Sequence, residues 1–150
     1  MRTFSSLDDV SAAAGSDVGT SRWLTIDQDL ICAFADATGD QQWIHVDEDR
    51  AAAGPFGTTV AHGFLILSLL PRLTAEVFSL ETPGARLNYG ANKVRFPSPV
   101  KVGSRIRATA TFLSLTDVPA GKQLVTRYTV EIEGHPKPAC VAETVALLLP

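Results

Sequence analysis

The chain has 150 residues, a length that fits one domain able to bury roughly 68–70% of its unfolded surface without a disulfide or a metal. Hydrophobic residues make up 45% of it and charged residues 19%, as in ordinary globular proteins, and the net charge of -3 provides no basic surface for nucleic acid. We therefore expect a single domain, residues 1–150, that binds no nucleic acid.

The cysteines and the N-terminal residues indicate a cytoplasmic protein. Cys32 and Cys140 lie far apart, and Cys32 falls on an apolar helical stripe, so that reduced core thiols are favoured over a disulfide or a metal site. The N-terminal residues include Asp8 and Asp9 and no apolar segment of the kind that directs export. The longest apolar run ends near Pro71, too short to span a membrane.

The N-terminal half of the chain has the pattern of helices. Polar capping residues and a glycine stop enclose a short helix within 5–15, and a second helix follows the capping-box spacing that begins at Thr25 and ends at Gly39. The acidic residues 47–49 begin a further helical turn, which ends at the glycine and proline of 54–57. From Ala61 to about Phe78 apolar residues cover more than one face, which predicts a central buried helix.

The C-terminal half has the pattern of strands. Its segments rich in Val, Thr, Ile, Tyr and Leu, separated by turn signals, are residues 86–95, 105–116, 123–133 and 139–149. The alternation within two of them indicates an antiparallel sheet with one face in water. Because the sheet and the helix must each bury an apolar face, we predict an α+β fold in which the antiparallel sheet wraps around a long central helix.

Asp40 and His45 are the candidate acid/base pair. They lie five residues apart, directly after the end of the second helix, and Ala61-His62-Gly63 begins the central helix soon afterwards. A carboxylate, an imidazole and the free amides of a helix N-terminus together suit chemistry at a carbonyl group. Each residue also has a structural reading, Asp40 as a turn aspartate and His45 and His62 as hydrogen-bonded core histidines.

These residues carry a resemblance to the MaoC-like, (R)-specific enoyl-CoA hydratases. The matching motifs are Gly39-Asp40 with His45 after four residues, Ala61-His62-Gly63, and the segment from Asn88 to Val100. Gln42-Trp43 replaces the commoner Asn-Pro and resembles the NodN-like branch. The resemblance covers most of the chain and implies a single hot-dog domain, a homodimer, and a place in fatty acid metabolism.

The resemblance implies that the chain is a hydro-lyase that adds water reversibly to trans-2-enoyl thioesters and forms a (3R)-hydroxyacyl product. It assigns Asp40 as the principal base and His45 as the residue that holds the same water and shares in proton transfer. A backbone amide at a helix N-terminus suits the charge that develops on the thioester oxygen, and we expect the Gly63 amide to be this donor. The residues expected to contact substrate are Trp43, His62, Phe64 and Arg95. The thioester carrier would be coenzyme A or acyl carrier protein, and which group protonates the α-carbon stays open.

Other kinds of site have weaker support in the sequence. No dense Cys/His spacing supports a metal site around Asp40, and no glycine-rich nucleotide motif or serine-hydrolase elbow is present, so we expect no metal and no cofactor. Arg95 and nearby cations could bind the phosphates of coenzyme A or could be ordinary exposed strand charges. The functional alternatives are a hot-dog acyl-CoA thioesterase and a non-catalytic acyl-thioester-binding subunit.

Overall fold

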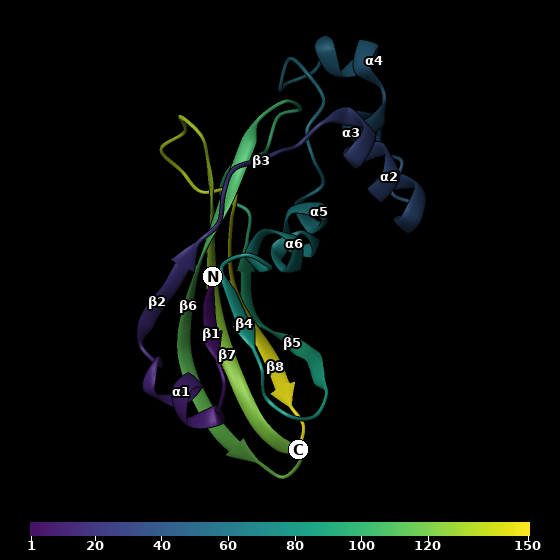
Figure 1. Cartoon of the computed structure of the whole chain (residues 1–150). Helices are drawn as coiled ribbons and strands as arrows, with labels where there is room; N and C mark the ends of the chain where they lie inside the picture. The colour runs from purple at the N-terminus through teal and green to yellow at the C-terminus, as the bar shows by residue number, and fades with distance from the viewer.

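A curved, six-stranded antiparallel sheet forms the body of the protein in the computed structural model, which describes residues 1–150 (Figure 1). The strands run in the spatial order β2-β6-β7-β8-β5, and β3 also pairs with β6. Their bounds are β2 Ser16–Thr20, β3 Leu24–Thr25, β5 Arg86–Arg95, β6 Arg105–Val118, β7 Gly121–Ile132 and β8 Cys140–Leu148. All four strands predicted in the C-terminal half are therefore present, as β5 to β8.

The central helical segment packs against this sheet and is shorter than predicted. It consists of two successive helices, α5 (Gly63–Ser68) and α6 (Leu70–Thr74), and Phe78, where the predicted helix was to end, instead begins strand β4 (Phe78–Leu80). Pro71 lies at the start of α6 and has no backbone N–H to continue the hydrogen-bond ladder of α5, which explains the division. The predicted arrangement of a sheet around a central helix is otherwise confirmed.

Two hydrophobic clusters divide the buried face of the sheet. The larger one joins the central helices to the sheet, and its residues include Leu65, Ile66, Leu69, Leu73, Ile106, Ala108, Val130 and Ala142. The smaller one covers the other end with the N-terminal residues, and its members include Phe4, Val10, Leu80, Phe112, Leu124 and Leu148. The Phe112 ring ties two other segments to the sheet, because its centre lies 5.1 Å from that of Phe4 in the N-terminal segment and 5.2 Å from that of Phe78 in β4.

The N-terminal segment contributes one predicted helix and one strand that the sequence did not reveal. Helix α1 (Leu7–Ala12) begins after the N-cap Ser6, whose side chain accepts from the Asp9 amide. Strand β1 (Arg2–Phe4) pairs in parallel with β4 to form a separate two-stranded sheet. None of the helices is long and apolar enough to cross a membrane.

Three further helices lie together at one end of the sheet, well away from α1 (Figure 1). They are α2 (Gln28–Thr38), α3 (Trp43–Val46) and α4 (Glu48–Ala52). The predicted capping residue of α2 was wrong: Thr25 lies in β3, and the N-cap is Asp27, whose carboxylate accepts from the Leu30 amide at 2.9 Å. The predicted end of α2 before Gly39 and the helical turn after Asp47 are confirmed.

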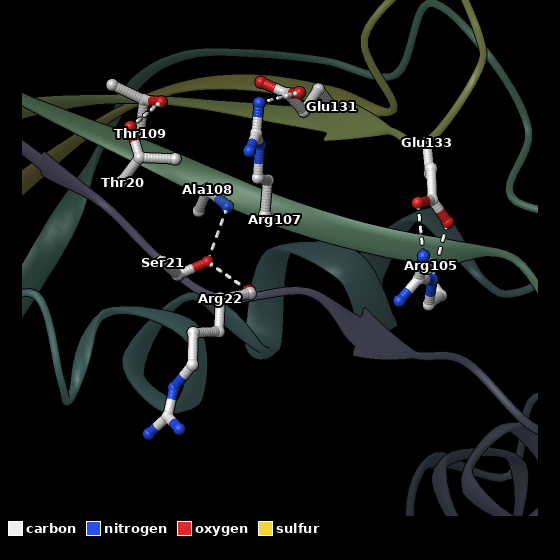
Figure 2. A network of polar contacts seen from close by, with 9 residues as sticks. All are labelled: Thr20, Ser21, Arg22, Arg105, Arg107, Ala108, Thr109, Glu131 and Glu133. Carbon is white, nitrogen blue, oxygen red and sulfur yellow. Dashed lines mark hydrogen bonds and ion pairs between the residues drawn. The ribbon is translucent and has the colours of Figure 1, made fainter.

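Polar pairs stabilise the solvent-facing side of the sheet between β6 and β7. Figure 2 shows Arg105 paired with Glu133 and Arg107 paired with Glu131 across these strands. The Arg107 guanidinium also lies 4.4 Å from the centre of the Trp23 ring. Exposed cross-strand pairs of this kind contribute little to stability because solvent screens them, so they help to set the strand register while the buried clusters provide most of the stability.

Candidate active site

The end of helix α2 places Asp40. Gly39 closes the helix in the left-handed conformation, with φ 77°, and its amide donates to the Ala35 carbonyl at 2.8 Å. Glycine adopts this conformation without the steric cost that a side chain would add. The Asp40 amide donates to the Thr38 hydroxyl at 3.3 Å, and the Asp40 carboxylate accepts from the Gln42 amide at 3.4 Å. Asp40 is therefore exposed but held in a defined turn.

Helix α3 places His45 in the interior, where it is 6% exposed. Its Nδ1 lies 2.6 Å from the carbonyl oxygen of Val60. Because a carbonyl only accepts, this contact assigns the proton of the neutral ring to Nδ1 and leaves a lone pair on Nε2. His45 is thus oriented as a proton acceptor.

His62 lies beneath this pair and contacts both of its members. Its Nε2 donates to the Asp40 carbonyl at 2.9 Å, and its ring stacks on His45 with centroids 3.7 Å apart and planes inclined by 22°. The ring of Phe34 lies 5.0 Å away on α2, and His62 is only 3% exposed. The Nδ1 atom of His62 is buried and has no hydrogen-bond partner.

Asp40, His45 and His62 converge on one point, since one potential ligand atom from each lies within 4.8 Å of the others. A metal ion prefers to lie in the plane of each imidazole that binds it, along the nitrogen lone pair. The rings of His45 and His62 are stacked 3.7 Å apart with planes inclined by 22°, so one ion at bonding distance could not lie in the planes of both. The arrangement therefore suits proton transfer better than metal coordination.

The surroundings of His45 keep it neutral. Burial lowers the pKa of His45 below its ordinary value of 6.5, and the charge of His62 acts in the same direction. The hydrogen bond to Val60 and the Asp40 carboxylate oppose this shift without reversing it. His45 consequently offers a free Nε2 lone pair at neutral pH.

Gly63 is the first residue of α5, and its amide N–H has no hydrogen-bond partner within the chain. Such unpaired amides are usual in the first turn of a helix and can bind an oxyanion. A side chain here would be obstructed, because a Cβ on Gly63 would lie 2.9 Å from the Phe96 ring. The backbone at this position is therefore closely covered by one aromatic ring.

The remaining predicted site residues make no hydrogen bond or ring contact with Asp40 or His45. Trp43 is half-buried and packs against the backbone of Gly54, with the Arg50 guanidinium 4.4 Å from its ring centre. Phe64 is 68% exposed and meets Phe96 edge to face at 6.1 Å. Arg95 is exposed at the end of β5.

A hollow lies farther along the central helices, between them and the sheet. It has a volume of about 960 Å³, and none of the converging residues lines it. Representative lining residues are Leu67, Pro71, Phe78, Tyr89, Leu124 and Tyr128. Burial raises the pKa of the Tyr128 hydroxyl. The hollow and the Gly63 amide share one helical segment, because Leu67 lies one turn beyond Gly63.

Gln28 and Thr59 contact this site, yet nothing in the sequence pattern singled them out. The Gln28 side-chain amide donates to the His45 carbonyl at 2.7 Å, and its oxygen accepts from the Thr59 hydroxyl at 2.5 Å. In the sequence Gln28 has the pattern of a helix-capping residue and Thr59 that of a loop residue. Their role depends on tertiary contacts between segments far apart in the chain.

The family model for the MaoC like domain matches residues 9–134. The chain belongs to the MaoC-like dehydratase family. This match includes every residue of the converging group and all but the last strand of the main sheet. The prediction drawn from the sequence motifs is thereby confirmed.

Among MaoC-like relatives, the 3-hydroxyacyl-thioester dehydratase Z of Mycobacterium tuberculosis is 57% identical over 146 residues, which cover 97% of each chain. Nodulation protein N of Rhizobium leguminosarum bv. viciae is 46% identical over 147 residues, 95% of this chain and 91% of that one. These two relatives also confirm the predicted likeness to the NodN-like branch.

Solved structures establish the hot-dog fold for this MaoC-like chain. The R-hydratase PhaJ1 of Pseudomonas aeruginosa, in its unliganded form, superposes with a TM-score of 0.72 at 24% identity and covers 91% of this chain and 81% of its own. The (R)-hydratase of A. caviae gives a TM-score of 0.69 at 21% identity, with coverage of 90% and 97%. At these identities the likeness concerns the fold alone.

Proposed function

We propose that the protein is an (R)-specific enoyl-thioester hydratase, or 3-hydroxyacyl-thioester dehydratase in the reverse direction. The observation that carries this proposal is the Asp40 carboxylate beside His45, whose Nδ1 is bonded to the Val60 carbonyl so that Nε2 is free to accept a proton. A relative 57% identical over nearly its whole length is a 3-hydroxyacyl-thioester dehydratase, which supports the same reaction class.

In the hydration direction, a water between Asp40 and His45 would donate hydrogen bonds to both. As its oxygen attacks C3 of the enoyl thioester, one water proton passes to this pair and the double-bond electrons move toward the thioester oxygen. A proton then adds to the α-carbon and completes the 3-hydroxyacyl product. Asp40 and His45 both begin as proton acceptors, so the one that takes the water proton can then donate it to the α-carbon. The reaction needs no cofactor.

The negative charge that develops on the thioester oxygen requires a donor, and the free amide of Gly63 is suited to supply it. The space that a side chain would fill is taken by the Phe96 ring, while the amide N–H itself stays unpaired. Loss of one such donor typically costs about 2.7–4 kcal/mol of transition-state stabilisation. The amide, and not a side chain, is therefore the proposed catalytic group of Gly63.

We assign the acyl chain to the hollow along the central helices. The distance along the helix from Gly63 to Ser68, which lines the hollow, is about 7.5 Å at 1.5 Å per residue, so a chain attached to a thioester at Gly63 can reach it. The proposed substrate contacts at the entrance are Trp43, Phe64 and Arg95. His62 lies beneath the pair, so its geometry supports positioning of Asp40 more than direct contact with the substrate.

The carrier on the substrate would be coenzyme A or acyl carrier protein.

An exposed edge strand, which pairs with a neighbour on one side only, supports a homodimer as the working unit. Strand β5 is the last strand of the sheet, and nine of its ten residues are exposed, including Leu87 and Tyr89. The exposed backbone groups of an edge strand are a template for pairing with another chain. We place the single-domain enzyme in the cytoplasm and in fatty acid metabolism.

Incubation of the protein with crotonyl-CoA tests the reaction class, with the conjugated-thioester absorbance and free thiol followed together. Loss of absorbance without thiol release supports the hydratase, whereas equimolar thiol release would indicate the thioesterase alternative. Tight binding of enoyl-CoA substrates of short and long chains, with no turnover of any, would support a binding subunit and contradict the proposal.

A further inference from the structure

The side chain of Gln28 joins two separate segments that together hold His45. Gln28 is the first residue of α2, and its amide nitrogen donates to the main-chain carbonyl of His45 at 2.7 Å. Its amide oxygen accepts from the hydroxyl of Thr59 at 2.5 Å. Thr59 directly precedes Val60, whose carbonyl accepts from Nδ1 of His45.

The partners fix which way this amide faces. The His45 carbonyl can only accept, so the NH₂ end of Gln28 must face it, and the oxygen is left for the Thr59 hydroxyl. A weaker contact at 3.4 Å joins the same NH₂ group to the Cys32 sulfur. Thr59 is 1% exposed, and its own carbonyl accepts from the Val102 amide at 3.0 Å, which ties this segment to the loop before β6.

Helix α2 thereby sets the positions of both members of the proposed acid/base pair. Gln28 at its N-terminus holds the His45 main chain, and Gly39 at its C-terminus delivers Asp40. A helix of 11 residues is a rigid spacer between these two points. Displacement of its N-terminal contact would change the orientation of the His45 ring relative to Asp40.

We propose that Gln28, together with the Thr59 hydroxyl, is a positioning residue for the reaction, which orients the His45 ring and thereby its free Nε2. This inference rests on the proposed function. Gln28 does not meet the substrate itself. Its loss should therefore lower kcat and leave KM nearly unchanged, because a misdirected base affects the reacting geometry more than acyl binding.

Two substitutions separate positioning from folding. Gln28→Met keeps the length of the side chain and removes both hydrogen bonds, while Thr59→Val removes the hydroxyl from a buried site of the same shape. Thr59→Ser retains the hydroxyl and should restore activity. Thr111→Val is the matched control, because Thr111 is also buried, donates to Asp17 at 2.5 Å, and lies on strand β6 with no hydrogen bond to the residues around His45.

We expect kcat for crotonyl-CoA hydration to fall about 10- to 100-fold in Gln28→Met and Thr59→Val, with KM changed less than about twofold. Thr111→Val should lower the melting temperature by a similar amount as Thr59→Val and leave kcat within about twofold of the parent. Equal kcat in all variants at matched folded fraction would overturn the proposal. A change confined to KM, or failure of Thr59→Ser to restore kcat, would do the same.

A readout independent of turnover separates this inference from the reaction class. The Nδ1 proton of His45 in the parent protein should be detectable by NMR and exchange slowly with water, because it is bonded to Val60. In Gln28→Met its exchange should be about tenfold faster, since one anchoring interaction has been removed. If the His45 Nδ1 proton exchanges equally fast in the parent and in Gln28→Met, the positioning role is refuted, whatever substrate the enzyme uses. If the parent is inactive on crotonyl-CoA and the exchange is still faster in Gln28→Met, only the proposed reaction is refuted.

Discussion

Replacement of Gly63 by alanine is a sharp test of how the proposed oxyanion site is built. The added Cβ would lie 2.9 Å and 3.0 Å from two carbons of the Phe96 ring. The backbone N–H is kept, and Gly63 has no positive φ that would oppose an alanine. The substitution therefore leaves the donor in place and changes only the space around it.

The size of the effect follows from that contact. Carbon atoms pack comfortably at about 3.5–4.0 Å, so the ring or the helix start must move by roughly 0.5 Å or more. A displacement of about 1 Å in a reacting geometry can lower the rate about 10²-fold. On a logarithmic scale, a displacement of about 0.5 Å then lowers the rate about tenfold. We expect kcat for Gly63→Ala to fall about 10- to 100-fold, less than the roughly 10²–10³-fold that follows complete loss of an oxyanion donor, because the N–H is retained.

The assay is the hydration of crotonyl-CoA, measured for Gly63→Ala, Phe96→Leu and the double variant. The smaller leucine relieves the contact, so the double variant should recover most of the kcat lost in Gly63→Ala. Thermal unfolding of each protein shows whether the fold is retained. A kcat for Gly63→Ala equal to that of the parent would refute the reasoning, because the close cover over Gly63 would then have no bearing on the reaction.

Three further predictions concern pH, assembly and thiol reactivity. Burial lowers the pKa of His45 below 6.5, so kcat/KM should stay level as pH falls to 6.5 and decline only below it, and an activity loss already at higher pH would contradict the assignment. The free energy of unfolding should also decline below pH 6.5, because the unfolded chain binds this proton more readily than the folded one. Leu87→Lys combined with Tyr89→Lys places charges on the exposed β5 edge and should halve the mass seen by light scattering, whereas an unchanged dimer would exclude this edge as the interface. Burial raises the pKa of Cys140 to about 11, so at neutral pH a thiol reagent should label Cys140 only after unfolding, and rapid labelling of the folded protein would show that its burial is wrong.

Local sequence patterns were sufficient for the long strands and for the turn that carries Asp40. Alternation and turn residues located β5 to β8, and Gly39 located the end of α2, because these features depend on neighbours in the chain. The short strands β2 and β3 escaped detection, since their pairing with β6 comes from tertiary contact and not from a periodic pattern of their own.

The sequence motifs singled out candidate site residues, and their contacts could not be predicted. The motifs identified Asp40, His45 and Gly63, but spacing alone does not show that His62 stacks on His45 or that Nδ1 of His45 meets Val60. Those contacts join segments 15 or more residues apart in the chain. The division of the central helix at Pro71 was visible in the sequence in principle, because a proline lacks the amide that an uninterrupted helix would need.

The most direct test of the central claim is the hydration of crotonyl-CoA by the parent protein, Asp40→Asn and His45→Gln, with the product resolved by chiral chromatography. We expect the (3R) alcohol from the parent, no free thiol, and rates lowered about 10²–10⁴-fold in each variant while the fold is retained. Formation of the (3S) product, or parent-like rates in either variant, would contradict it.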